Sequence, residues 1–154
     1  MIRVLFLCTG NICRSPMAEG VFLHLVREAG LQDRFTIDSA GTDHWHVGER
    51  VHRGTRKVLA AHGIQYDHRG RRISRAEVDR WDYIIAMDYS NMHVLERMAD
   101  GHRGEIGMLL DYAPELGVHE VPDPYYNGRF EEVYRLVEAG CRGLLDHIRD
   151  KEGF

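Results

Sequence analysis

Residues 2–16 of the chain read IRVLFLCTGNICRSP, and this stretch decides the fold. Its first half, Ile2–Cys8, is an apolar run of strand length, which predicts a buried β-strand. Its second half contains Gly10 and Asn11, which tolerate the backbone angles of a tight loop. The Ser15-Pro16 pair that follows is typical of the start of a helix. The stretch therefore predicts a strand, a short loop and a helix in immediate succession.

Strand-like and helix-like segments alternate through the rest of the chain. Further strands are predicted at Phe35–Ala40, Tyr83–Met87 and Ile106–Leu110. Such alternation is typical of an α/β fold, here a four-stranded parallel sheet with helices on both faces and a phosphate-binding loop after the first strand. No repeat or Pro/Ser-rich linker interrupts the pattern, so residues 1–154 are expected to form a single domain.

The predicted helices fill the gaps between these strands. Apolar residues with helical spacing run from Met17 to Val26, and Gly30 stands where that helix would end. A Ser-Arg-Ala-Glu capping box begins at Ser74, and Ser90 is the predicted cap of a helix reaching about Met98. The clearest helix is the last. Its apolar stripe comprises Phe130, Val133, Tyr134, Val137, Cys141, Leu144, Leu145 and Ile148.

Composition narrows the class of protein. Apolar residues make up 44% and charged residues 29%, and no apolar run reaches the length of a membrane span. The net charge of −4 argues against non-specific nucleic-acid binding, which needs a basic surface. Three cysteines do not make a disulfide framework, so reduced thiols and a cytoplasmic location are expected. A monomer is the default expectation.

The loop after the first strand has the chemistry of an oxyanion site. Backbone N–H groups turned inward there form an anion-binding nest, and the helix that follows adds its own free N–H groups. Arg14 can offer two donors to a phosphate. This positive surrounding favours a thiolate at Cys8, which could then attack phosphorus. The loop residues expected to surround the phosphate are Thr9, Gly10, Asn11, Ile12, Cys13 and Ser15.

Two other interpretations of Cys8 carry less weight. A buried cysteine can be a small core residue, and Cys8 with Cys13 could ligate a metal. Too few other Cys or His residues cluster at zinc spacing, and the His44-Trp45-His46 segment is a poor metal pair, so no metal and no cofactor are expected.

A second motif can supply the proton that an oxygen leaving phosphorus would need. Asp123 lies between two prolines, which stiffen the backbone and hold the carboxyl group in place. One carboxyl group can protonate a leaving oxygen and later activate water. Tyr125 and Tyr126 follow as an aromatic wall for a phenyl ring. Alone, Pro-Asp-Pro would be a surface turn; together with the cysteine loop it predicts a general acid.

These two motifs resemble those of the low-molecular-weight protein tyrosine phosphatases. Residues Cys8 to Pro16 are similar to that family's active-site loop, and Asp123 to Tyr126 to its general-acid loop. The resemblance covers nearly the whole chain. It implies hydrolysis of phosphotyrosine, in proteins or small aryl phosphates, through a phosphocysteine and without a metal.

The resemblance also implies roles for individual residues. Cys8 would be the nucleophile, Arg14 the transition-state clamp, and Asp123 the general acid and then base. Ser15 would stabilise the thiolate, and Asn11 and His68 would shape the loop through hydrogen bonds. Trp45, Tyr125 and Tyr126 would line the cleft. In this family the second loop cysteine, here Cys13, can trap an oxidised nucleophile as a disulfide.

Where many relatives carry a proline and an aspartate, this chain has Glu49 to Gly54, which bears on substrate preference.

Two rival activities on this scaffold are arsenate reduction and protein-arginine phosphatase activity. Arsenate reduction needs additional cysteines, and none lies between Cys13 and Cys141. Arginine phosphatases tend to have a smaller polar residue in place of Ile12. A non-enzymatic oxyanion-binding redox sensor would keep Cys8 and Arg14 but would not need Asp123.

Overall fold

Four strands form one parallel sheet in the computed structural model, which describes residues 1–154. The strands are β1 (Ile2–Cys8), β2 (Phe35–Gly41), β3 (Tyr83–Ala86) and β4 (Glu105–Met108). Their order is β2-β1-β3-β4, and every neighbouring pair is parallel. The predicted four-stranded parallel sheet is thereby confirmed.

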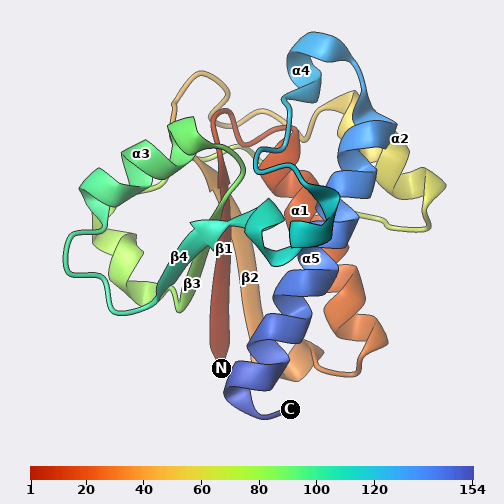
Figure 1. The fold of residues 1–154 in the computed structure, drawn as a ribbon. Helices are drawn as coiled ribbons and strands as arrows, with labels where there is room; N and C mark the ends of the chain where they lie inside the picture. The colour runs from red at the N-terminus through yellow and green to blue at the C-terminus, as the bar shows by residue number, and fades with distance from the viewer.

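Helices lie on both sides of this sheet (Figure 1). The α-helices are α1 (Arg14–Glu28), α2 (Arg53–Ala61), α3 (Tyr89–Met98), α4 (Pro124–Asn127) and α5 (Phe130–Glu152). Four short 3-10 helices are η1 (Gln32–Arg34), η2 (Arg75–Arg80), η3 (Leu109–Tyr112) and η4 (Pro114–Leu116). None of the helices is both long enough and apolar enough to span a membrane.

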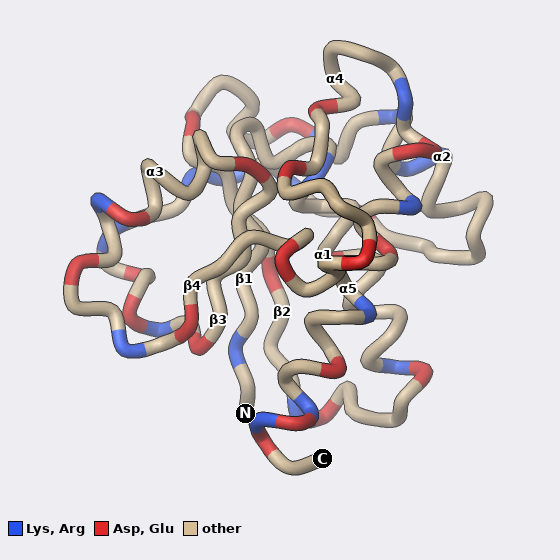
Figure 2. The backbone as a smooth tube through the Cα atoms, in the orientation of Figure 1, with Lys and Arg blue, Asp and Glu red and all other residues tan.

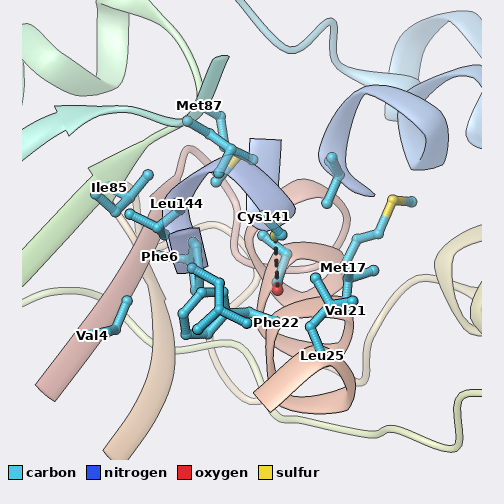
Figure 3. Close-up of a cluster of buried hydrophobic side chains, with 14 of the residues drawn as sticks. Val4, Phe6, Met17, Val21, Phe22, Leu25, Ile85, Met87, Cys141 and Leu144 are labelled. Atoms are coloured by element: carbon cyan, nitrogen blue, oxygen red, sulfur yellow. Dashed lines mark hydrogen bonds between the residues drawn. The ribbon is translucent and has the colours of Figure 1, made fainter. Parts of the chain in front are cut away.

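The larger core lies between one face of the sheet and helices α1 and α5. Alternate residues of β1, such as Val4 and Phe6, point into it. Phe6 meets Phe22 of α1 edge to face, with ring centroids 5.5 Å apart. Cys141 of α5 is fully buried here and donates to a backbone oxygen of α1, so it is a core residue, as its apolar stripe predicted (Figure 3).

The smaller core covers the opposite face. Leu5 and Leu7 of β1 and Ile84 of β3 pack there against Leu95 of α3 and Val78 of η2. Both faces of β1 are thus apolar, which explains why Ile2–Cys8 is a continuous apolar run rather than an alternating one.

Several element ends, one helix type and one cap differ from the sequence predictions. β2 extends to Gly41 and β3 ends at Ala86, each one residue from its predicted end. β4 ends at Met108, because Leu109 and Leu110 already belong to η3. The capping box at Ser74 does open a helical segment, but that segment is the 3-10 helix η2. Helix α3 is capped by Asp88 rather than Ser90: the Asp88 carboxylate accepts a hydrogen bond from the Asn91 amide (2.8 Å).

The topology fixes where a ligand can bind. The chain passes from β1 to β2 on one side and from β3 to β4 on the other, so the strand order reverses between β1 and β3. In open parallel sheets the crevice at this reversal, beyond the carboxyl ends of the strands, is the usual binding site. Cys8 ends β1 at this point, and Asp88 lies just beyond β3.

Candidate active site

The loop between β1 and α1 folds into a ring around the Cys8 sulfur. Asn11 has a left-handed backbone, with φ of 59°, and is the one non-glycine residue in the chain with a positive φ. This conformation turns its amide toward Cys8, with a distance of 3.3 Å from Asn11 N to Sγ. Helix α1 then starts at Arg14 with its free N–H groups directed at the same ring.

Ser15 provides a second donor for the sulfur. Its Oγ lies 3.0 Å from Cys8 Sγ and accepts a hydrogen bond from Asn11 Nδ2 at 2.9 Å. The Ser15 proton is thus left for Sγ or for the carbonyl of Ala40, which is farther away at 3.4 Å. Donation to Sγ stabilises a thiolate, because hydrogen bonds to a charged group are stronger than neutral ones.

The buried Asn11 side chain holds this arrangement in place. Its Oδ1 accepts from the amide of Arg71 (3.0 Å) and from His68 Nε2 (2.8 Å), and its Nδ2 also donates to Ser39 (3.0 Å). Burial lowers the pKa of His68, which favours the neutral ring with its proton on Nε2. All the polar atoms of the Asn11 side chain are paired, which offsets the cost of a left-handed asparagine.

Behind Ser39 the hydrogen-bond network ends at Glu19. Ser39 Oγ donates to Glu19 Oε1 at 2.7 Å, and burial raises the pKa of Glu19 to about 7. Since this pKa lies above that of an unfolded glutamate, the folded chain holds the proton more tightly, and the associated stability is lost as the pH rises toward 7.

We therefore expect the free energy of unfolding to contain a Glu19 contribution that falls by on the order of 2 kcal/mol between pH 5 and 7. Glu19→Gln keeps an acceptor for Ser39 and should flatten this slope in urea titrations at several pH values. The matched control is Glu96→Gln on the exposed face of α3. An unchanged slope in Glu19→Gln would contradict the assignment.

Arg14 closes the ring from the opposite side and is buried, with 3% of its side chain exposed. Its Nη1 donates to Asp88 (2.7 Å) and to the carbonyl of Val121 (2.9 Å). Its Nη2 has only longer contacts, 3.5 Å to Thr9 Oγ1 and 3.6 Å to Asp123 Oδ2. One side of the guanidinium is thus fixed by the protein, and the other is left for an oxyanion.

Asp123 lies above this ring as the N-cap of the one-turn helix α4. Its Oδ1 accepts from the Tyr125 amide at 3.0 Å, and its side chain is 29% exposed. The segment before it is tied to the sheet, because Val121 N donates to the carbonyl of Met87 (2.9 Å). The backbone of Val121 thus positions both Arg14 and the carboxyl group two residues later.

The pocket above Cys8 has an aromatic rim. Trp45, Tyr125 and Tyr126 are all exposed, and the Tyr125 ring lies 5.2 Å from that of Tyr126 and 5.6 Å from that of His46. The pocket brings together ten of the predicted site residues, and His46 as an eleventh that was not predicted. The ten are Cys8, Thr9, Gly10, Ile12, Cys13, Arg14, Trp45, Asp123, Tyr125 and Tyr126. Asn11, Ser15 and His68 lie behind it as support.

Sequence reasoning missed Asp88, Asn91 and His46. Asp88 binds Arg14, and Asn91 Nδ2 donates to Thr9 Oγ1 at 3.1 Å. Both follow β3, so the rule that parallel strands end at a common edge could have indicated them. No such signal marks His46, because it reaches the pocket from a long loop. Its Nδ1 is hydrogen-bonded to Glu49 Oε2 at 2.8 Å.

The Glu49–Gly54 stretch, where the sequence departs from the pattern of many relatives, lies beside the pocket. His52 is the N-cap of α2, and its Nδ1 accepts from the Gly54 amide at 2.9 Å. The His52 ring stacks on Phe130 at 5.0 Å and lies 5.9 Å from the Tyr125 ring. A Cβ at Gly54 would come within 2.4 Å of the Phe130 ring, so this packing requires glycine.

Cys13 is buried against the pocket and unpaired. Burial raises the pKa of its thiol, and the neighbouring Cys8 and Asp123 raise it further. Cys13 is therefore held as a neutral thiol, which leaves nucleophilic attack to Cys8.

A parallel α/β sheet with a cysteine at the carboxyl end of its first strand, ringed by amides and an arginine, defines the class of cysteine-centred phosphate-binding proteins. The family model described as low molecular weight phosphotyrosine protein phosphatase matches residues 3–153. The chain belongs to this family.

Individual relatives agree with this assignment. The chain is 46% identical to the low molecular weight protein-tyrosine-phosphatase YfkJ of Bacillus subtilis, covering 99% of each chain, and 44% identical to one from Streptomyces coelicolor, covering 97% and 94%. The YfkJ crystal structure superimposes with a TM-score of 0.94, covering 98% of this chain and 96% of that one. A Drosophila arginine phosphatase, 37% identical, gives a TM-score of 0.89, covering 96% and 98%.

Proposed function

We propose that this protein hydrolyses phosphotyrosine monoesters through a phosphocysteine intermediate, without a metal. One observation carries the proposal: Cys8, Arg14 and Asp123 line the same pocket, under an aromatic rim that fits a phenyl ring. These are a nucleophile, an oxyanion clamp and a proton donor, which together are sufficient for the reaction.

In the first step the Cys8 thiolate attacks phosphorus and the bond to the tyrosine oxygen breaks. The amides of the loop and the free side of Arg14 bind the equatorial oxygens, where charge is spread in the transition state. Asp123 gives its proton to the departing tyrosine oxygen. The tyrosine leaves, and phosphate stays on sulfur.

In the second step a water molecule hydrolyses the phosphocysteine. Asp123, now a carboxylate, takes a proton from the water as its oxygen attacks phosphorus, and the sulfur leaves as a thiolate. Ser15 and the Asn11 amide stabilise that thiolate, since both lie within hydrogen-bond distance of Sγ. Inorganic phosphate is then released.

Phosphoarginine is the rival substrate, because a Drosophila arginine phosphatase is among the similar structures. Phosphotyrosine is favoured here by Ile12, an apolar residue in the pocket lining, and by the rim of Trp45, Tyr125 and Tyr126. The chain lacks the further cysteines that arsenate reduction needs. A redox sensor without turnover would not require a proton donor such as Asp123.

The deciding experiment compares kcat/KM for one peptide carrying phosphotyrosine, phosphoarginine or phosphoserine. We expect phosphotyrosine to lead by at least about tenfold, because its phenyl ring can bury apolar surface against Ile12 and the aromatic rim. Ile12→Thr should shift the ratio of kcat/KM values toward phosphoarginine. A metal chelator should leave turnover unchanged in the unaltered protein and in Ile12→Thr. A lead for phosphoarginine in the unaltered protein would overturn the proposed substrate.

We also propose that residues 1–154 work as one domain in the cytoplasm. The three cysteines support that location, since all are buried and unpaired.

A further inference from the structure

A basic groove runs along α2, next to the active site but separate from it. Its lining includes Arg50, Arg53, Arg56 and Lys57 on one side and Gln65 and Asp67 on the other. It shares no lining residue with the pocket above Cys8. Lys and Arg gather in the same region of the backbone, around α2 (Figure 2).

Most of the positive charge in this groove is not neutralised by the protein. Asp67 is the one acidic residue in the lining, and it is paired with Arg50 at 3.0 Å. Arg53, Arg56 and Lys57 have no carboxylate within 4.0 Å. In a chain with a net charge of −4, such a concentration of unpaired cations is a local feature rather than the general character of the surface.

The position of these cations is also unfavourable for the helix that carries them. Arg53 is the first residue of α2, Arg56 and Lys57 follow one turn later, and the first turn contains no acidic residue. The N-terminal end of a helix carries partial positive charge, so cations there are destabilising. The fold does not bury Arg53 or Lys57, which are exposed. A bound anion would relieve both the mutual repulsion and the unfavourable helix end.

The groove begins beside the rim of the active site. His52, the residue before Arg53, donates its backbone N–H to the carbonyl of Ile12 at 2.7 Å, and its ring faces Tyr125. An extended peptide advances about 3.3 Å per residue, so residues a few positions from a phosphotyrosine in the pocket can reach the groove.

We propose that this groove binds an acidic segment of the substrate, with Asp or Glu side chains a few residues from the phosphotyrosine. The inference rests on the proposed function and adds a substrate class to it: phosphoproteins with acidic sequence beside the target tyrosine. A peptide fits better than a nucleic acid, since a few cations in one short groove do not form the extended basic surface that a nucleic-acid backbone requires.

The test uses two phosphotyrosine peptides that differ only in their flanks, one with several Glu residues and one with Gln at the same positions. We expect kcat/KM to favour the acidic peptide by about tenfold at low salt, mainly through KM, and the preference to shrink as salt is raised. Arg53→Glu/Lys57→Glu should abolish or reverse it while leaving p-nitrophenyl phosphate turnover unchanged.

The matched control is Arg97→Glu/Arg103→Glu, which makes the same change in net charge near α3 and should keep the preference. If the first double variant fails to fold, Arg53→Gln/Lys57→Gln serves in its place. Equal rates for the two peptides, or a preference that survives the variant, would overturn the docking inference but not phosphotyrosine hydrolysis. Binding to anionic lipid vesicles without a peptide preference would overturn it as well. Failure of p-nitrophenyl phosphate and both peptides to react would instead refute the proposed function.

Discussion

Cys8→Ser is expected to abolish hydrolysis, with kcat reduced on the order of 10⁴–10⁶-fold. A serine hydroxyl in the same place can still bond to Ser15 and to the Asn11 amide, so the loop should keep its shape. It does not ionise at working pH and is a poor nucleophile without a general base. Turnover of p-nitrophenyl phosphate measures the loss, and an unchanged melting temperature shows that the fold is intact.

Cys141→Ala is the control for this result. It removes a buried thiol from the core, where its sulfur donates to Ala18 O, and should lower the melting temperature without lowering kcat of the folded protein. Substantial turnover by Cys8→Ser would exclude Cys8 as the nucleophile.

Asp123→Asn is expected to slow turnover by about 10²–10⁴-fold. An asparagine can still accept from the Tyr125 amide and cap α4, so the change removes the proton rather than the local structure. The loss should be larger for phenyl phosphate than for p-nitrophenyl phosphate, since the better leaving group depends less on an acid. Because the same group is proposed to activate water, the phosphocysteine should persist long enough to be trapped by acid quench.

A matched comparison is Asp111→Asn, an exposed carboxyl group in η3, which should leave kcat unchanged. Equal losses for the two leaving groups would indicate that Asp123 acts on the structure of the site and not on proton transfer.

The parts of the molecule that the sequence predicted best are those set by neighbouring residues. The first strand, its loop and the start of α1 follow from Ile2–Cys8 and the residues just after it, and the stripe of α5 from its helical spacing. Local sequence does not decide where a helix begins when two nearby residues can both cap it. Ser90 and Asp88 are both good caps, and Asp88 is the cap of α3 because its backbone is extended.

Contacts between distant segments could not be predicted in this way. His68 reaches Asn11 across 57 positions, and Asp88 reaches Arg14 across 74. No local pattern marks His68, which was identified through the family resemblance alone. Asp88 does follow β3, so its place at the edge where parallel strands end could have indicated it, but not its partner Arg14. The basic groove was missed for the same reason, since its two sides meet only when the chain around Asp67 folds back along α2.

The hydrogen bonds of Val121 have a consequence for how this chain can vary in length. Its N–H donates to Met87, the residue just after β3, and its carbonyl accepts from Arg14, while the proton donor follows two positions later. Lengthening or shortening the link between positions 121 and 123 would move the acid away from the sulfur while the clamp stayed in place. Insertions and deletions are therefore expected to be tolerated more easily on either side of this link than within it.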